Sequence, residues 1–119
     1  MNRQQRGFKA ALKAAKRSKF YSHRVGAAIF IGSNLISTGH NRHKSHPKSV
    51  CWTMHAEFSS LVRLIREDLS NAVLYVTRLT RTNKVSCAKP CEACQKIILK
   101  LGIKKVYYTN HEGILEKLY

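Results

Sequence analysis

Acidic side chains are scarce in this sequence, in which six Asp and Glu stand against 22 Lys and Arg and give a net charge of +16. None of the six comes before Glu57, although eleven Lys and Arg do. Such a basic chain is typical of a protein that meets phosphates, so we keep nucleic acid open as a partner. A basic protein without any polyanionic partner is the simpler alternative.

Long apolar runs are also missing. The longest is VGAAIFIG at residues 25–32, far short of the roughly 18 residues that a membrane-spanning helix needs. We therefore expect no membrane partner. Four cysteines without a secretory signal fit a reducing, cytoplasmic compartment, where a CxxC pair more often binds metal or acts in redox chemistry than forms a structural disulfide.

The length of 119 residues predicts a single domain over residues 1–119 with one core. Apolar residues recur with helical spacing in some segments and as short β-type runs in others. The expected elements are a helix over 3–19 with a cationic outer face, a hairpin of strands 25–31 and 35–40, a helix of about 12 residues from His55, a strand over 72–78, a loop over 79–89, a helix from Pro90 to Leu101, and a strand over 104–110. Helices that alternate with strands predict an α/β fold.

The end of the chain limits the direction of a further strand. Only nine residues, HEGILEKLY, follow the strand at 104–110, whereas a parallel neighbour needs a crossover of a dozen or more residues. We therefore predict that Ile114 to Tyr119 fold back antiparallel beside residues 105–109, with Gly113 in a tight loop. A single terminal helical turn without a further strand is the alternative.

Two predicted helix starts carry side chains that bind metals. His55 and Glu57 lie at the first, and Cys91 and Cys94 lie at the second, in KPCEACQ. Three nitrogen or sulfur ligands with an open fourth position are typical of a catalytic zinc, whereas a structural zinc has four protein ligands. Free N–H groups and the dipole at a helix start also favour thiolates.

His55 and Glu57 diverge in direction because they are two residues apart on one helix. If His55 binds the metal, the carboxylate of Glu57 extends beside it toward the open position, where it can transfer protons. Two other classes stay open. A non-catalytic, zinc-stabilised nucleic-acid-binding module would use a fourth ligand such as Cys87 and would not need Glu57, and a thiol redox protein would use Cys91 and Cys94 without metal.

Four blocks of this sequence, HRVGAAIFIGSNLISTGHN, HAE, LYVTR and PCEACQKIILKLGIKKVYYT, resemble successive parts of the cytidine and deoxycytidylate deaminase superfamily. The resemblance covers roughly residues 18–110 and includes the HxE and PCxxC signature of zinc nucleobase deaminases. It implies a three-layer α/β fold in which helices flank a mixed central sheet of four to five strands. Within this superfamily, the antiparallel final pair predicted above is the arrangement of nucleoside cytidine deaminases. The implied activity is zinc-dependent hydrolysis of cytosine to uracil with release of ammonia.

The resemblance also assigns roles to residues. It implies that His55, Cys91 and Cys94 bind one zinc ion per chain, and that Glu57 passes a proton from the attacking water to the ring and to ammonia. The residues that it matches to substrate contacts are Asn41 for sugar and base, Val25, Gly26 and Ala27 beneath the base, and the backbone of Ala56 for its polar edge. Zinc lowers the pKa of its bound water to about 7, so hydroxide is available at neutral pH.

The loop after Asn41 departs from nucleoside-specific relatives, which place a glutamate close behind that asparagine. Arg42, His43 and Lys44 follow here, and we take them as candidate phosphate-binding residues of a cytosine nucleotide, as in the deoxycytidylate branch. A nucleoside substrate and a homo-oligomer remain compatible with the sequence. Cytosine in single-stranded DNA or RNA is an alternative substrate, for which Trp52, Tyr21 and Phe20 are candidate stacking residues.

Overall fold

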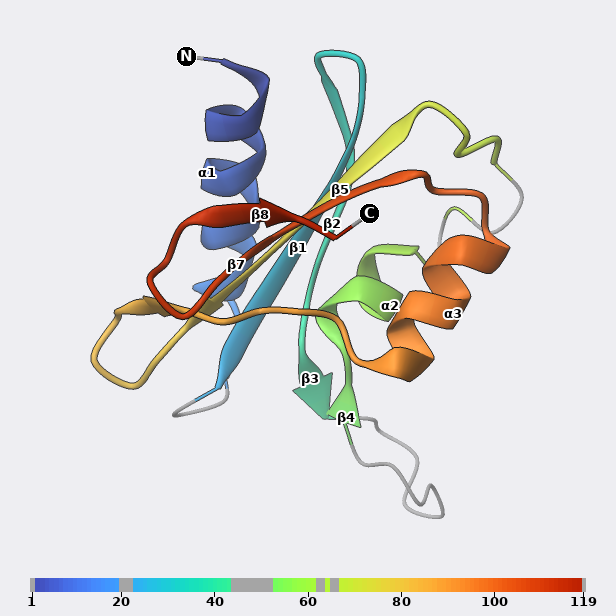
Figure 1. Cartoon of the computed structure of the whole chain (residues 1–119). Helices are drawn as coiled ribbons and strands as arrows, with labels where there is room; N and C mark the ends of the chain where they lie inside the picture. Colours follow the sequence, from blue (N-terminus) through green and yellow to red (C-terminus); the bar gives the residue numbers. More distant parts are fainter. Residues whose placement is uncertain (1, 20–22, 44–52, 62–63, 65–66, 119) are drawn as a thin grey trace.

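One mixed β-sheet organises the structure (Figure 1), a computed structural model that describes residues 2–19, 23–43, 53–61, 64 and 67–118. Its elements are α1 (Arg3–Ala15), β1 (Arg24–Ile31), β2 (Asn34–His40), β3 (Arg42–His43), β4 (Thr53–Met54), α2 (Ala56–Leu61), β5 (Ala72–Leu79), β6 (Val85–Ser86), α3 (Glu92–Lys100), β7 (Lys105–Thr109) and β8 (Leu115–Lys117). The six-stranded sheet has the order β2-β1-β5-β7-β8, and β6 pairs with β5. Only β5 and β7 are parallel neighbours. β3 and β4 form a separate two-stranded ribbon.

Helices cover both faces of this sheet and make three layers. Side chains on one face of the strands, such as Ala28 and Tyr75, pack with Ala11 of α1. The opposite face carries Ala27 and Val76, which belong to the larger core that α2 and α3 complete. β1 and β5, at the centre of the sheet, have nearly continuous apolar runs and are buried on both faces. Among the described residues, no helix is long and apolar enough to cross a membrane.

Glycine at position 26 lets α1 approach the sheet closely. A Cβ placed on Gly26 would collide with the backbone of Ala11 and Ala15 in α1. Backbone atoms cannot rotate away as side chains can, so any side chain here would push the helix outward. The cationic outer face predicted for α1 is present, since Lys9, Lys13 and the other cations of the helix are exposed.

We expect Gly26→Ala to lower the free energy of unfolding by about 1–3 kcal/mol, the usual cost of overpacking. Urea unfolding followed by circular dichroism would measure it. Ser33→Ala, at an exposed turn position, should leave the midpoint unchanged. An unchanged midpoint for Gly26→Ala would contradict the close docking of α1.

The last strand confirms the predicted hairpin and excludes the terminal helical turn. Tyr107 pairs with Lys117 and Thr109 with Leu115 in an antiparallel ladder. Gly113 has a φ of 79°, which a residue with a Cβ rarely adopts. The side-chain oxygen of Asn110 also accepts hydrogen bonds from the backbone N–H groups of Glu112 and Ile114, at 2.9 and 3.0 Å.

Three local predictions differ from the structure. The first helix ends at Ala15 rather than at residue 19; beyond it the buried Ser18 donates a hydrogen bond to the carbonyl oxygen of Asn41, which turns the chain toward the sheet. Pro90 precedes the N-cap residue Cys91 instead of lying in the first turn of α3. The segment 79–89, predicted as a loop, contains the short strand β6, so the described sheet has six strands instead of the expected four to five. The described part of the second helix is α2, and residues 62–63 and 65–66 lie outside the described residues.

Candidate active site and metal centre

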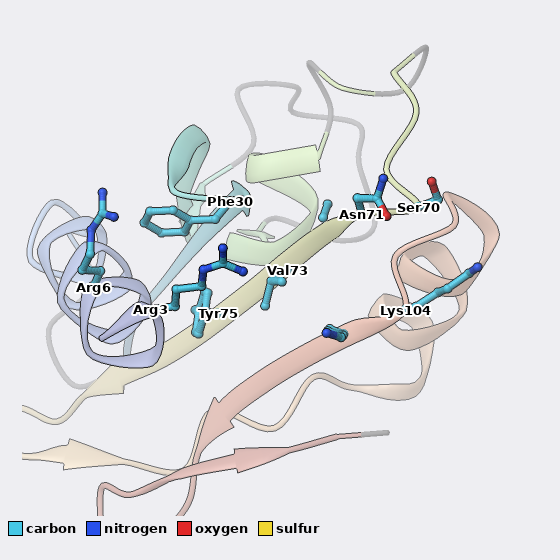
Figure 2. A pocket seen from close by; sticks show the side chains of 11 residues that line it. Arg3, Arg6, Phe30, Ser70, Asn71, Val73, Tyr75 and Lys104 are labelled. Atoms are coloured by element: carbon cyan, nitrogen blue, oxygen red, sulfur yellow. The ribbon is translucent and has the colours of Figure 1, made fainter. Parts of the chain in front are cut away.

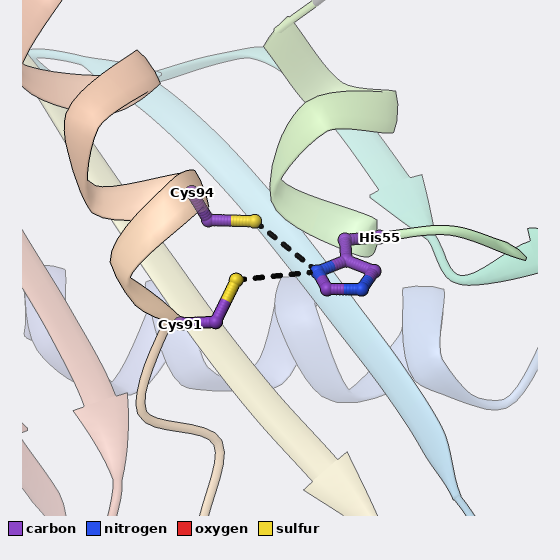
Figure 3. Close-up of side chains that lie close together, drawn as sticks. All are labelled: His55, Cys91 and Cys94. Carbon is purple, nitrogen blue, oxygen red and sulfur yellow. Dashed lines mark hydrogen bonds between the residues drawn. The ribbon is translucent and has the colours of Figure 1, made fainter. Parts of the chain in front are cut away.

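Two helix starts bring the predicted ligands together on the α2/α3 face of the sheet. His55 directly precedes α2, and its carbonyl oxygen accepts the hydrogen bond from Ser59 N–H at 2.9 Å. Cys91 is the N-cap of α3, and Cys94, whose side chain is buried, lies in the first turn. Figure 3 shows both sulfur atoms facing the imidazole of His55. Residues that are 36 positions apart in the chain therefore meet at one point.

The distances in this cluster fit a tetrahedral metal ion. Nδ1 of His55 lies 3.2 Å from Sγ of Cys94 and 3.6 Å from Sγ of Cys91. All three potential ligand atoms lie within 4.8 Å of one another. Metal–sulfur bonds of about 2.3 Å and metal–nitrogen bonds of about 2.0 Å at tetrahedral angles separate neighbouring ligand atoms by roughly 3.5–3.8 Å. The donor set and its spacing thus fit zinc, and both contacts of the imidazole use Nδ1.

Cys87 does not belong to this cluster. Its thiol is free and half-buried, and it lines the cavity beside the cluster. Within the described residues, the group that could hold a metal consists of His55, Cys91 and Cys94 alone. This composition matches an open catalytic site better than a closed structural site, which needs four protein ligands.

A cavity of about 550 Å³ opens next to the cluster. Its volume is that of an ordinary small-molecule site. Val25, Asn41, His55, Ala56 and Cys91, all predicted site residues, line it. The cavity therefore gathers residues from β1, the end of β2, and the starts of α2 and α3.

Asn41 holds one wall of the cavity in place. Its side-chain Oδ1 accepts a hydrogen bond from Val25 N–H at 2.9 Å, and its Nδ2 donates to the carbonyl oxygen of His23 at 2.6 Å. The residue is only 7% exposed. An amide can donate two hydrogen bonds and accept two, so Asn41 retains capacity for a ligand while it fixes the start of β1.

Comparison with known proteins places the chain in a family. Residues 1–110 match the family model for the cytidine and deoxycytidylate deaminase zinc-binding region. The chain is 30% identical to a deoxycytidylate deaminase of Mycobacterium phage D29, over 84% of this chain and 88% of the phage protein. The chain belongs to the cytidine and deoxycytidylate deaminase family. It is therefore a zinc-dependent deaminase, a hydrolase.

Solved structures agree with this assignment and confirm the predicted three-layer fold. The apo dCMP deaminase of cyanophage S-TIM5 is 25% identical and has a TM-score of 0.67, with 92% of this chain and 86% of the phage chain covered. A cytidine deaminase from Burkholderia pseudomallei is 20% identical, with a TM-score of 0.73 over 98% of this chain and 91% of that one. The second likeness concerns the fold alone.

Several predicted site residues lie elsewhere or outside the described part of the deaminase. Neither Gly26 nor Ala27 is among the residues that line the cavity, and Gly26 faces α1 on the opposite side of the sheet. Glu57 is the second residue of α2, but its side chain is not described. Arg42 and His43 form β3; their side chains, like the whole of Lys44, lie outside the described residues. The candidate stacking residues Phe20, Tyr21 and Trp52 and the fourth cysteine, Cys51, also lie outside them.

Basic residues other than the predicted site residues also line the cavity. His23, Arg78, Lys89 and His111 line it, and no described lining residue is acidic. The Nε atom of Arg78 is buried and has no hydrogen-bond partner among the described residues. Partial burial, together with Arg78 and His55 nearby, lowers the pKa of His23. The cavity is therefore suited to a negatively charged ligand.

The strand pattern of the sequence indicates one of these residues, Arg78. Alternation along β5 puts Arg78 on the same sheet face as Leu74 and Val76, which are buried in the core. A cation in register with core residues indicates a polar site at the end of the strand. His111 and Lys89 lie in loops that only tertiary structure brings to the cavity.

Proposed function

We propose that this deaminase converts the cytosine of a deoxycytidine nucleotide to uracil, with addition of one water and release of ammonia. His55, Cys91 and Cys94 would hold one zinc ion per chain. The proposal rests on one observation above all: the cluster of these three residues opens into a cavity lined by basic side chains without a described acidic one. A homo-oligomer and a cytoplasmic location stay predictions.

The residues at the start of α2 suit the proton transfers of this reaction. Zinc, when bound, supplies a water of lowered pKa for attack on C4 of the base. Glu57, two residues after His55, is the candidate that transfers both protons of this water in turn. It would pass the first to ring N3 and the second to the amino group, which then departs as ammonia. Ala56 lines the cavity, where its backbone can contact the polar edge of the base.

The basic lining supports a nucleotide rather than a bare nucleoside. A nucleoside has no charge for Arg78 or Lys89 to bind, and a buried donor such as Nε of Arg78, which lacks a partner among the described residues, is costly to leave unpaired. A phosphate would provide charge-assisted hydrogen bonds at this wall. Deoxycytidylate deaminase is also the name of the relative from Mycobacterium phage D29. Arg42, His43 and Lys44 remain candidates for further phosphate contacts.

A substrate panel tests the proposal. We expect the zinc-loaded protein to deaminate dCMP with a higher kcat/KM than cytidine, deoxycytidine, dCTP or a cytosine-containing oligonucleotide, with uracil formation as the readout. Preference for the nucleosides would show that the basic lining has another role. Preference for the oligonucleotide would show that the substrate is cytosine in a single-stranded nucleic acid.

Arg78 offers a sharper test of nucleotide recognition. We expect Arg78→Gln to raise KM for dCMP by about 10-fold or more, the effect of losing one charged hydrogen bond of about 1.5–3 kcal/mol. Turnover of deoxycytidine should not change. Arg81→Gln, the same change at an exposed position in the β5–β6 loop, is the matched control. If kcat/KM falls equally for dCMP and deoxycytidine, Arg78 supports the fold and does not bind phosphate.

A further inference from the structure

A second cavity lies on the opposite face of the sheet, between the start of α1 and the starts of β5 and β7. Its volume is about 350 Å³. Figure 2 shows Phe30, Val73 and Tyr75 along its floor, and these side chains point to the α1 face. The metal cluster and its cavity lie on the other face, with α2 and α3. The sheet therefore separates the two cavities.

The walls of this second cavity are cationic. Arg3 and Arg6 of α1 line one side, and Lys104 and Lys105 at the start of β7 line the other, while no described lining residue is acidic. In Figure 2, Arg3 extends from α1 across Tyr75. Hydrogen bonds from Ser70 chiefly lower the pKa of Asp68, which does not line the cavity, and nearby Lys104 lowers it further. Four cations around one recess repel one another, and a bound anion would relieve this repulsion.

Arg6 is held in place by the protein, although no acidic side chain among the described residues pairs with it. One of its terminal nitrogens donates a hydrogen bond to the carbonyl oxygen of Ser33 at 2.9 Å, and its guanidinium carbon lies 5.9 Å from the centre of the Phe30 ring. The start of α1 is closed by its own capping box between Asn2 and Gln5. The positive charge of the cavity therefore comes from side chains and not from free N–H groups of the helix end.

Further cations continue this charge along the helix. Arg3, Arg6 and Lys13 are exposed, and their spacing places them along one side of α1. Arg17, which is also exposed, follows just beyond the end of the helix. The thirteen residues of α1 span about 20 Å. The surface is thus longer than one small anion and long enough for several consecutive phosphates of one chain.

We propose that the second cavity and this side of α1 bind the phosphate backbone of a single-stranded nucleic acid. A flexible strand can enter the recess between helix and sheet, whereas a rigid duplex or a flat bilayer cannot. Tyr75 and Phe30 are only 3% and 7% exposed, so the aromatic floor offers no free ring for base stacking. Binding is therefore independent of base sequence and strongly dependent on salt.

Fluorescence anisotropy of a labelled oligothymidylate tests this surface, because thymine gives the deamination site no cytosine to bind. The zinc-loaded full chain is titrated at several salt concentrations. Four phosphate contacts predict that the logarithm of the association constant falls with the logarithm of salt concentration with a slope of about −3. Lys104→Gln with Lys105→Gln should make this slope shallower by about 1.4 and weaken binding about 25-fold at 0.1 M salt. Arg3→Gln with Arg6→Gln should have a similar effect.

Lys96→Gln with Lys100→Gln is the matched control, since it removes two exposed lysines from α3 and lowers net charge equally. It should keep the affinity and the slope of the unchanged protein. Turnover of dCMP should be the same in all these variants, whether or not dCMP proves to be the preferred substrate. Equal losses in the control would overturn the proposal in favour of net charge. Absence of oligonucleotide binding at 0.1 M salt would also overturn it. The same holds if the protein binds inorganic triphosphate or anionic phospholipid vesicles but not the oligonucleotide.

Discussion

Glu57→Gln is expected to lower kcat for cytosine deamination by about 10²- to 10⁴-fold, the usual contribution of a positioned general acid–base. The amide has nearly the same shape as the carboxylate, but it cannot accept and release a proton. Zinc content and the unfolding midpoint should stay those of the unchanged protein, because Glu57 is not a proposed ligand. Steady-state kinetics, metal analysis and thermal unfolding of the same preparation provide the measurements.

Glu92→Gln is the matched control for this change. Glu92 lies directly after Cys91, is exposed, and stabilises the first turn of α3 as an acidic residue. Its neutralisation should cost little stability and leave kcat within a few-fold of the value for the unchanged protein. Near-normal turnover of Glu57→Gln would refute the proposed proton transfer. It would also favour the alternative of a zinc-stabilised binding module, in which Glu57 has no role.

Cys91→Ser is expected to lose zinc and stability together. The cluster joins the starts of α2 and α3, so metal binding and the packing of these helices form one unit. A ligand present at about 1,000 times its dissociation constant stabilises a folded protein by about 4 kcal/mol. Its loss should lower the melting temperature of a domain of this size by roughly 15 °C. Addition of a strong chelator to the unchanged protein should produce the same shift.

Cys91 suits this experiment because its side chain is exposed, whereas Cys94 is 5% exposed and a serine there would also bury a hydroxyl group. Cys87→Ser is the control, since Cys87 lies beside the cluster and outside it. It should retain stoichiometric zinc. If Cys91→Ser still binds one zinc per chain, Cys87 is a ligand and the site is closed rather than catalytic.

The direction of the last strand shows how a correct structural prediction can leave the substrate open. In the resemblance drawn from the sequence, an antiparallel final pair is the arrangement of nucleoside cytidine deaminases. β7 and β8 have this arrangement, although the similar phage protein is a deoxycytidylate deaminase. The left-handed conformation at Gly113 and the hydrogen bonds to the side chain of Asn110 explain the hairpin, and neither residue lines the cavity beside the metal cluster. The cavity wall at Arg78 therefore bears more directly on substrate.

The sequence by itself determined the elements whose signals are local. Continuous apolar runs gave β1 and β5, Gly102 followed the end of α3, and Gly113 allowed the final hairpin. Short elements with weak signals were missed. β6 has only two residues and depends on a turn in which Asn83 adopts a φ of 64°, a conformation that sequence patterns rarely indicate for a residue other than glycine.

Residue chemistry in the sequence also determined the ligand candidates, because His55, Cys91 and Cys94 stand at predicted helix starts. Only the tertiary structure decided that their side chains meet, and that Arg78, Lys89 and His111 surround the same cavity. It also decided that Gly26 serves the docking of α1 and that four cations enclose a second recess. The physical reason is the same in each case. Local hydrogen bonding and apolar periodicity are properties of neighbouring residues. A cavity is formed by side chains from distant segments, and their positions depend on the packing of the whole sheet.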